Sequence, residues 1–162
     1  MEVDSEKLEQ RVKRFKERLR QTGVRLTHQR LAVFIEVAKT DDHPDAETVY
    51  RRVLATVPTI SLDTVYRTLW RLFDLGLVGA LDPPRKRVRF DANTEPHHHF
   101  VCRKCGRTRD FYDARFDRLE VSEAVRALGK VEAAHVELAG LCVRCLQENE
   151  HDKNDVAKGG NP

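Results

Sequence analysis

Apolar residues recur at helical spacing through the first half of the chain and predict four helices there. Leu8, Val12, Phe15 and Leu19 share one face of the first helix, which we expect over residues 5–21. Each of the other three follows a residue whose side chain can accept a hydrogen bond from the first helical turn. These helices are expected after Thr27, from Asp45, and from Ser61 to Gly76.

Beyond Gly76 the pattern changes to two β-rich stretches, residues 77–81 and 87–90. Two prolines and flanking polar residues separate them, which is typical of a strand–turn–strand unit. The tip of this unit is basic, with Arg85, Lys86, Arg87 and Arg89. Helices followed by a basic hairpin are typical of the winged helix-turn-helix, a frequent DNA-binding architecture.

A second domain is predicted after a short polar segment. Its expected elements are strands over residues 99–102, 108–112 and 131–141, and a helix carrying Phe116, Leu119, Val125 and Leu128. The fold class is therefore α+β, with a winged-helix domain and a small α/β domain. The expected boundaries are residues 1–90, a hinge at 91–96, the second domain at 97–147, and a polar, disordered tail at 148–162.

Charge divides unevenly between these halves. The net charge is only +3, but residues 1–90 carry 18 Lys and Arg against 13 Asp and Glu, while residues 91–162 carry 11 against 13. The first half therefore holds all of the positive excess, which indicates different functions for the two domains. No apolar run approaches the length of a membrane span, and the charged N-terminus lacks the apolar core of a signal peptide. We therefore expect a cytoplasmic protein.

The four cysteines form two CxxC pairs, Cys102/Cys105 and Cys142/Cys145, with 36 residues between them. Two thiolates from each pair complete a tetrahedral zinc shell without an open position, so we predict one structural Zn²⁺ per subunit. Such a site stabilises a small domain. Four unrelated buried cysteines are one alternative. A redox-active CxxC pair is another, which is disfavoured because Cys105 precedes Gly106 and does not open a helix.

Histidine and aspartate residues form a second candidate cluster: His43, Asp91, His97, His99 and Asp110. Alternate residues of a strand share a face, so His97 and His99 would point the same way. Three imidazoles and two carboxylates suit Fe(II) or Mn(II) better than structural zinc. If His43 joined the set, one ion would connect the two domains and link metal binding to DNA affinity. The alternative is a solvated polar turn and an unrelated His43.

The predicted helix after Ser61 would read DNA. Its apolar residues, Phe73 included, are expected to face inward, which leaves a polar face for the major groove. Arg67 suits guanine, and Thr64 or Tyr66 suits a thymine methyl group. All DNA-contact candidates together are Arg25, Gln29, Ser61, Thr64, Tyr66, Arg67, Arg71, Arg85, Lys86 and Arg87. For each basic residue alone, a solvated face is the alternative.

These segments together resemble the ferric uptake regulator (Fur) family of bacterial metal-dependent repressors, over about residues 10–147. The resemblance implies a cytosolic homodimer in which a winged-helix domain precedes an α/β dimerisation domain. It also implies binding to palindromic operator DNA when metal is present. The segments that carry it are residues 23–30, 43–50, 61–69, 76–78, 89–91 and 97–99 and both CxxC pairs.

The resemblance assigns the regulatory metal to the histidine–aspartate cluster. Two aspartates, at Asp91 and Asp110, are similar to the peroxide-sensing branch (PerR), because iron- and zinc-uptake relatives tend to have Glu or Cys there. That branch implies that Fe(II) reacts with hydrogen peroxide, that a ligand histidine, His43 or His97, is oxidised, and that metal and operator are released. The Mn(II) form would bind DNA and ignore peroxide. An iron-, zinc- or manganese-responsive repressor of the family is the alternative.

A possible auxiliary metal site is implied by the same resemblance. His98, Asp117 and His135 occupy matching positions, but Pro96 stands where the iron-responsive branch often has another histidine. Ordinary surface or interface roles for these residues are the alternative.

Two other classes of function compete with a repressor. A metalloenzyme is disfavoured because five protein ligands leave little room for a substrate and no separate general base stands near the histidines, so we expect no enzymatic activity. A zinc-stabilised interaction module that does not bind DNA would show no salt-dependent affinity for a duplex.

Overall fold

The computed structural model describes residues 3–81, 87–131 and 134–148. The chain divides into two compact units, unit 1 at residues 1–95 and unit 2 at residues 96–162. Within the described ranges, no helix is both long and apolar enough to span a membrane.

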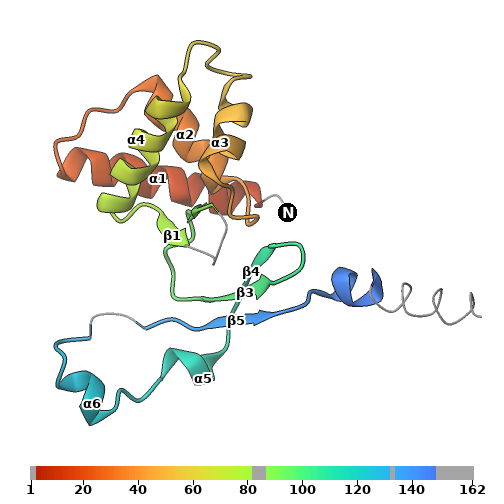
Figure 1. The fold of residues 1–162 in the computed structure, drawn as a ribbon. Coiled ribbons are helices and arrows are strands. Elements are labelled where there is room, and N and C mark those ends of the chain that lie inside the picture. The colour runs from red at the N-terminus through yellow and green to blue at the C-terminus, as the bar shows by residue number, and fades with distance from the viewer. Residues whose placement is uncertain (1–2, 82–86, 132–133, 149–162) are drawn as a thin grey trace, which may run out of the picture. The chain divides into compact units, whose positions relative to one another are not determined.

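Unit 1 contains four helices, each beginning where an acceptor side chain caps it. The caps accept a hydrogen bond from the backbone N–H three residues on, as in Ser61 with Thr64 at 3.1 Å, and this satisfies an otherwise unpaired donor. The predicted helices after Thr27, Asp45 and Ser61 and over residues 5–21 are confirmed. They are α1 (Ser5–Gln21), α2 (His28–Ala38), α3 (Ala46–Val53) and α4 (Leu62–Asp74), shown in Figure 1.

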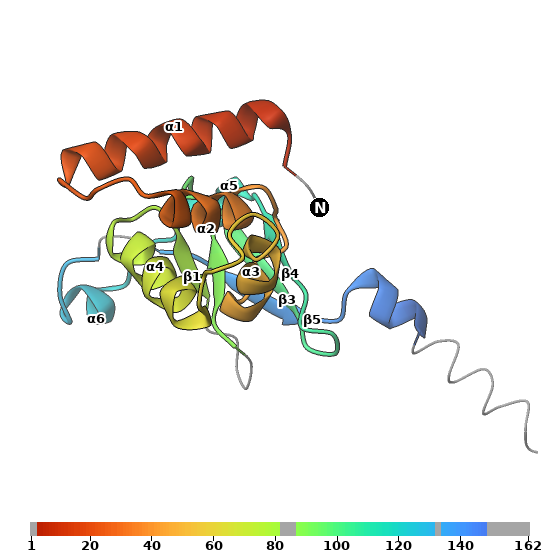
Figure 2. The ribbon, with the colours of Figure 1, turned by 90° about the horizontal axis from the view of Figure 1, so that it is seen from above.

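One apolar cluster fills the interior of unit 1. The long helix α1 lies along α2 (Figure 2), and the rings of Phe15 and Phe34 stack with centroids 4.4 Å apart. Both rings are almost fully buried, as are Val65, Leu69 and Leu72 on the inner face of α4. Phe73 departs from the predicted inward face, because its side chain is 42% exposed beside Trp70.

A two-stranded antiparallel sheet follows α4. Strand β1 (Gly79–Leu81) pairs with β2 (Arg89–Asp91) in the register Gly79 to Asp91. Each strand begins two residues later than predicted, and β2 extends one residue into the predicted hinge. Of the predicted wing tip, Arg85 and Lys86 lie outside the described residues.

Unit 2 is built on a three-stranded sheet with β3 in the centre. Strand β3 (His98–Cys102) pairs antiparallel with β4 (Thr108–Phe111) and parallel with β5 (Glu137–Gly140). Residues 143–148 are helical, so residue 148 does not belong to the predicted disordered tail, and residues 149–162 lie outside the described part of the chain.

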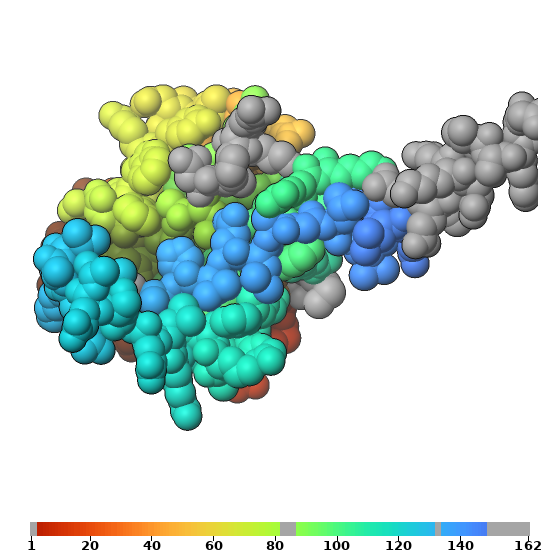
Figure 3. Space-filling model, turned by 60° about the horizontal axis from the view of Figure 1, so that its bottom comes forward, coloured from red at the N-terminus to blue at the C-terminus, as the bar shows by residue number. Residues whose placement is uncertain are grey.

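The single helix predicted through Phe116, Leu119, Val125 and Leu128 is wrong. Two short helices, α5 (Ala114–Asp117) and α6 (Glu123–Arg126), stand in its place. Leu119, Val125 and Leu128 are exposed, Leu128 to 86%. In the described part of unit 2 these three side chains bury little surface, and a short helix needs packing to persist. Figure 3 shows this part of unit 2 at the surface.

Candidate metal centres

The two CxxC pairs converge in unit 2. Cys102 ends β3, Cys105 follows on the turn to β4, and Cys142 and Cys145 come directly after β5. The four sulfur atoms lie within 4.8 Å of one another, and the Sγ atoms of Cys105 and Cys142 are 3.8 Å apart. None of the four forms a disulfide. Four convergent sulfur atoms are the donor set of a structural Zn²⁺ site.

The backbone around this cluster favours the thiolate form that a metal requires. N–H groups of Cys105 and Cys142 point at the Cys102 sulfur and lower the pKa of its thiol to about 5. Burial, together with the neighbouring sulfur atoms, raises the pKa of Cys145 to about 12. Without a cation the cluster therefore keeps a proton, because four negative charges cannot share this volume. A divalent ion removes that conflict.

Unit 1 contributes a histidine–carboxylate pair. His43 lies in the loop before α3 and is 1% exposed, and its Nε2 lies 3.6 Å from Oδ2 of Asp91 at the end of β2. The other Asp91 oxygen, Oδ1, accepts a hydrogen bond of 2.7 Å from the backbone N–H of Asn93. This bond fixes the carboxylate with one oxygen toward the imidazole.

Unit 2 contributes two histidines and a second carboxylate. His97 and His99 lie on one side of β3, as alternation predicts, with their Nε2 atoms 2.8 Å apart. Asp110 pairs directly with His99 across the sheet, and its Oδ1 lies 3.9 Å from Nε2 of His97 and 3.7 Å from Nε2 of His99. These three side chains are at most one-tenth exposed, and imidazole nitrogen with carboxylate oxygen is a donor set that suits Fe(II) or Mn(II).

The residues of the possible auxiliary site are arranged differently. His98 points to the other face of β3, is almost fully buried, and its Nε2 lies 3.1 Å from Oδ1 of Asp117. Its Nδ1 accepts a hydrogen bond of 3.3 Å from the backbone N–H of Val136, which places the ring proton on Nε2. A cation at this pair would have to replace that proton. His135 is exposed just before β5.

The predicted DNA-reading face of α4 is exposed. The Arg67 guanidinium lies 3.2 Å from the Asp63 carboxylate, and both side chains are 75% exposed, so the pair costs little to separate. Tyr66 and Arg71 are exposed on the same helix. Arg25, in the segment before α2, and Gln29, in its first turn, are also exposed. Ser61 and Thr64 also serve the helix cap, since their hydroxyl oxygens are 2.8 Å apart.

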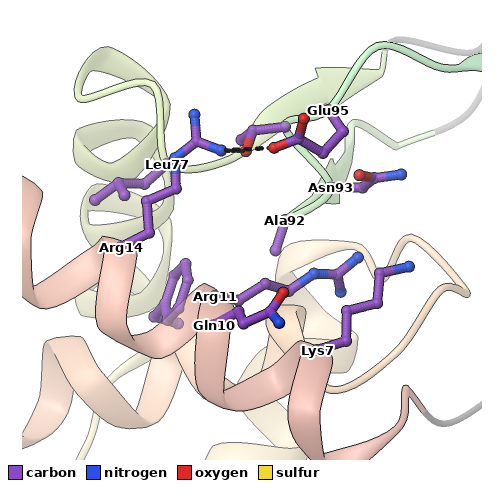
Figure 4. Close-up of a pocket in the computed structure, with 10 residues that line it drawn as sticks. Lys7, Gln10, Arg11, Arg14, Leu77, Ala92, Asn93 and Glu95 are labelled. Atoms are coloured by element: carbon purple, nitrogen blue, oxygen red, sulfur yellow. Dashed lines mark hydrogen bonds and ion pairs between the residues drawn. The ribbon is translucent and has the colours of Figure 1, made fainter.

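A small cavity of about 150 Å³ lies between α1 and the end of unit 1 (Figure 4). Arg14 of α1 contacts the Thr94 hydroxyl and reaches the Glu95 carboxylate at 3.3 Å. Arg11 donates a hydrogen bond of 2.7 Å to the carbonyl of Ala38. Arg14 thus holds the last residues of unit 1, a role that the sequence pattern did not indicate, because the contacts cross about 80 residues of chain. Arg11 instead ties α1 to the end of α2.

Comparison with known proteins shows a consistent relationship. A model of the ferric uptake regulator family matches residues 21–139. The peroxide-responsive repressor PerR of Staphylococcus epidermidis is 34% identical over 132 residues, which cover 80% of this chain and 87% of that protein. The Campylobacter jejuni peroxide stress regulator is similar in structure, with a TM-score of 0.60 and 27% identity over 83% of this chain and 98% of the other. The Vibrio cholerae ferric uptake regulator aligns with a TM-score of 0.64 and 26% identity, over 78% and 98%. The predicted fold class is confirmed.

Proposed function

The chain belongs to the ferric uptake regulator family and is a metal-dependent transcriptional repressor, and we propose that it is a peroxide sensor. In this proposal the regulatory ion is Fe(II) or Mn(II), separate from a structural Zn²⁺ at the four cysteines. Its ligands would be His43, Asp91, His97, His99 and Asp110. The active form would be a cytoplasmic homodimer on operator DNA, without enzymatic turnover.

The observation that carries the peroxide branch is the identity of the two carboxylates. Asp91 lies against His43 in unit 1, and Asp110 lies against His97 and His99 in unit 2, so both carboxylates accompany imidazoles. Aspartate has one methylene fewer than glutamate and reaches less far from its strand. Relatives that are more than 30% identical over most of the chain are peroxide-responsive repressors.

The proposed ligands also supply a route from metal to DNA affinity. His43 and Asp91 belong to the unit that carries α4, while the other three belong to the unit that carries the cysteines. An ion that binds all five would favour one arrangement of the two units. Operator binding then favours the same arrangement, and the two affinities are linked reciprocally.

Bound Fe(II) would activate hydrogen peroxide at the site, and the oxidised histidine would supply the two electrons of the net reduction. His43 and His97 are the residues of this chain expected to be oxidised, because an imidazole next to the ion meets the oxidant first. In balance, one histidine gains one oxygen atom from hydrogen peroxide and one water molecule is formed. The oxidised ring is a poor ligand, so the ion leaves and the arrangement that binds DNA is no longer favoured.

The dimer is proposed to form through unit 2. Strand β5 is an edge strand with one neighbour, β3, and such an edge can accept another strand. Large apolar side chains are exposed in the same unit, and their burial would offset the cost of association. They are Tyr112, Leu119, Val125, Leu128, Val131, Leu138, Val143 and Leu146.

One experiment tests the peroxide branch. Full-length, zinc-replete protein is loaded with Fe(II) or with Mn(II) and bound to a duplex selected from a random pool with the Mn(II) form. Micromolar hydrogen peroxide is then added, and anisotropy and peptide mass spectrometry follow. The Fe(II) form should release DNA and gain one oxygen atom on the peptide with His43 or His97, while the Mn(II) form should do neither.

The variant Asp110→Glu is the matched control, since it keeps the charge and moves the carboxylate by one methylene. It should retain repression and lose peroxide sensitivity. If the wild-type Fe(II) form keeps its DNA through peroxide, the sensor proposal is wrong. The protein is then an iron-responsive repressor, the second candidate, which the similarity to the Vibrio cholerae regulator favours.

A further inference from the structure

We propose that Arg89 is a positioning residue for the regulatory metal, because its guanidinium fixes the backbone at His43 and so aims that imidazole at Asp91. The inference rests on the proposed function, in which both residues are ligands. The sequence pattern places Arg89 in the basic hairpin, but not among the candidates for DNA contact. Its contacts in unit 1 support a role in positioning the His43 loop.

His43 has an unusual backbone conformation. Its φ is +49°, and among the residues that the structure describes it is the one non-glycine residue with positive φ. An L-residue rarely adopts this left-handed conformation without outside support, and such conformations concentrate at functional sites. The residue after it is Pro44, which restricts the same backbone further. The imidazole direction thus depends on whatever holds this loop.

Arg89 provides that support directly. Its Nη1 donates a hydrogen bond of 2.9 Å to the carbonyl oxygen of His43 and lies 3.5 Å from the carbonyl oxygen of Asp42. Both acceptors belong to the turn that contains the left-handed residue. Arg89 is half-buried, so these bonds compete less with water than bonds at an open surface would.

The strand that carries Arg89 also holds the loop through its backbone. The N–H of Phe90 donates a hydrogen bond of 3.0 Å to the carbonyl of Pro44, and Asp45 forms a β-bridge with Arg89. The loop is therefore attached to β2 at several successive residues. Since β2 ends at Asp91, one rigid strand carries the carboxylate and the residue that positions the histidine.

Geometry along β2 explains why residue 89 can do this. Residues 89 and 91 are two apart in a strand, so their side chains leave the same face. The Arg89 guanidinium reaches the backbone of the His43 loop while the Asp91 carboxylate reaches its imidazole at 3.6 Å. Outer-shell partners of this kind orient a ligand and tune its affinity for the ion.

Arginine suits the task better than lysine would. Its planar guanidinium presents several N–H donors in fixed directions, so one group can serve two carbonyl oxygens, whereas an ammonium is a compact point charge. Neighbouring Arg87 offers a matched comparison. It is exposed and contacts the carboxylates of Glu47 and Asp45. Within the part of the chain that the structure describes, it makes no hydrogen bond to the His43 turn.

The test measures Mn(II) affinity of full-length, zinc-replete protein by electron paramagnetic resonance of the free ion. Wild type, Arg89→Met, Arg89→Lys, Arg87→Met and His43→Ala are compared. Arg89→Met should weaken Mn(II) binding by about tenfold to a hundredfold, the usual effect of losing an outer-shell partner. Arg89→Lys should lie between it and wild type, and Arg87→Met should change affinity by less than about threefold, as an exposed ion pair allows.

Co(II) absorption supplies a readout that a purely structural role would not move. With Co(II) in the regulatory site, the visible bands should shift in Arg89→Met and stay unchanged in Arg87→Met, while zinc content and circular dichroism match wild type. Wild-type affinity and bands in Arg89→Met would overturn the proposal, and so would equal losses in both methionine variants. If Arg89→Met does not fold, Arg89→Lys decides by the same criteria.

The variant His43→Ala distinguishes failure of the proposed regulatory site from failure of the positioning role of Arg89. If it binds Mn(II) as tightly as wild type, the proposed regulatory site is wrong. If it loses the ion while Arg89→Met keeps it, the site is right and only the positioning role of Arg89 is wrong.

Discussion

Unit 1 and unit 2 bury apolar side chains to very different extents. In unit 1 a continuous cluster runs from Phe15 on α1 to Ala92 after β2 and draws on every helix. In unit 2 the buried apolar residues of the described segments are Val101, Cys102 and Cys145, two of which are proposed zinc ligands. Unit 1 can therefore gain its stability from hydrophobic burial. The described part of unit 2 buries few apolar side chains, and we propose that a bound ion and a second chain stabilise it.

This difference in apolar burial fits the different functions proposed for the two units, DNA binding for unit 1 and metal-dependent regulation for unit 2. The proposed DNA-reading helix α4 packs Val65, Leu69 and Leu72 into the apolar cluster, so its shape is held by packing and not by a bound ion. A unit held by ligands and by association responds to what is bound to it. In the proposed repressor, unit 1 is held by apolar packing and supplies His43 and Asp91 to the regulatory site, whereas unit 2 depends on bound metal for its structure.

The largest expected effect is loss of the cysteine site. Cys102→Ser, or removal of zinc by a chelator, should unfold unit 2, because the binding free energy of such a site is about 10 kcal/mol or more and the buried apolar area is small. Hydrogen exchange read by mass spectrometry should show lost protection in β3, β4 and β5 with α1–α4 unchanged. Zinc returned to the chelated wild type should restore it. Protection that survives in β3 would mean that the sheet supports itself.

Truncation of a core side chain in unit 1 should destabilise unit 1 and leave unit 2 intact. Phe15→Ala removes a ring stacked on Phe34 and should lower the free energy of unfolding of unit 1 by about 3–5 kcal/mol. Chemical denaturation followed by Trp70 fluorescence measures it, and zinc content should stay constant. Phe73→Ala makes the same change at a ring that is 42% exposed and should cost far less. Equal losses of unfolding free energy in Phe15→Ala and Phe73→Ala would show that the buried cluster does not dominate the stability of unit 1.

Association should depend on the exposed apolar residues of unit 2. Leu128→Glu should raise the dimer dissociation constant at least about tenfold, or roughly 1.4 kcal/mol, because a charge would enter an apolar contact. Analytical ultracentrifugation measures it. Arg126→Gln shifts the net charge by the same amount on the neighbouring helix α6 and is the control. A dimer unaffected by Leu128→Glu would place the interface elsewhere.

The smallest effect concerns the cap of α3. Asp45→Ala should cost unit 1 about 1 kcal/mol at neutral pH, since the side chain accepts the Thr48 N–H at 2.7 Å. Burial raises the pKa of Asp45, but the Thr48 hydrogen bonds and the charges of Arg87 and Arg89 outweigh it, so the pKa lies below its ordinary value of 3.8.

A carboxyl group with a lowered pKa stabilises the fold fully above its unfolded pKa, and the contribution disappears as the pH falls through the folded pKa. The difference between Asp45→Ala and wild type should therefore be constant at neutral pH and shrink in acid below the ordinary value. Thermal unfolding across that range checks it. A difference independent of pH would show that the cap acts without its charge.

Sequence predicted the local features of this chain and missed the distant ones. Thr27, Asp45 and Ser61 mark helix starts because capping depends on neighbours three residues away. The CxxC pairs are visible for the same reason. The helix predicted through Leu119 and Leu128 is wrong, because both side chains are exposed in the structure and a continuous helix there would gain little from packing.

Arg89 was missed because its acceptor, the His43 carbonyl, lies 46 residues away in the chain. Every residue has a backbone carbonyl, so this hydrogen bond cannot be predicted from the types of side chain along the sequence. The left-handed conformation of His43 was hidden for a similar reason, since glycine, not histidine, is the usual sequence sign of positive φ.

The position of the second cysteine pair has a consequence for synthesis. Cys142 and Cys145 follow β5, whose partner β3 precedes it by about 40 residues, so the ion would act as a reversible cross-link across a long loop. Closing a loop of that length in the unfolded chain is worth about 4 kcal/mol in the chain-entropy account. Residues 1–95 leave the ribosome well before Cys145 does. Unit 1 is thus free to fold during translation, while unit 2, in the proposed arrangement, would be complete only after Cys145 has emerged and zinc has bound.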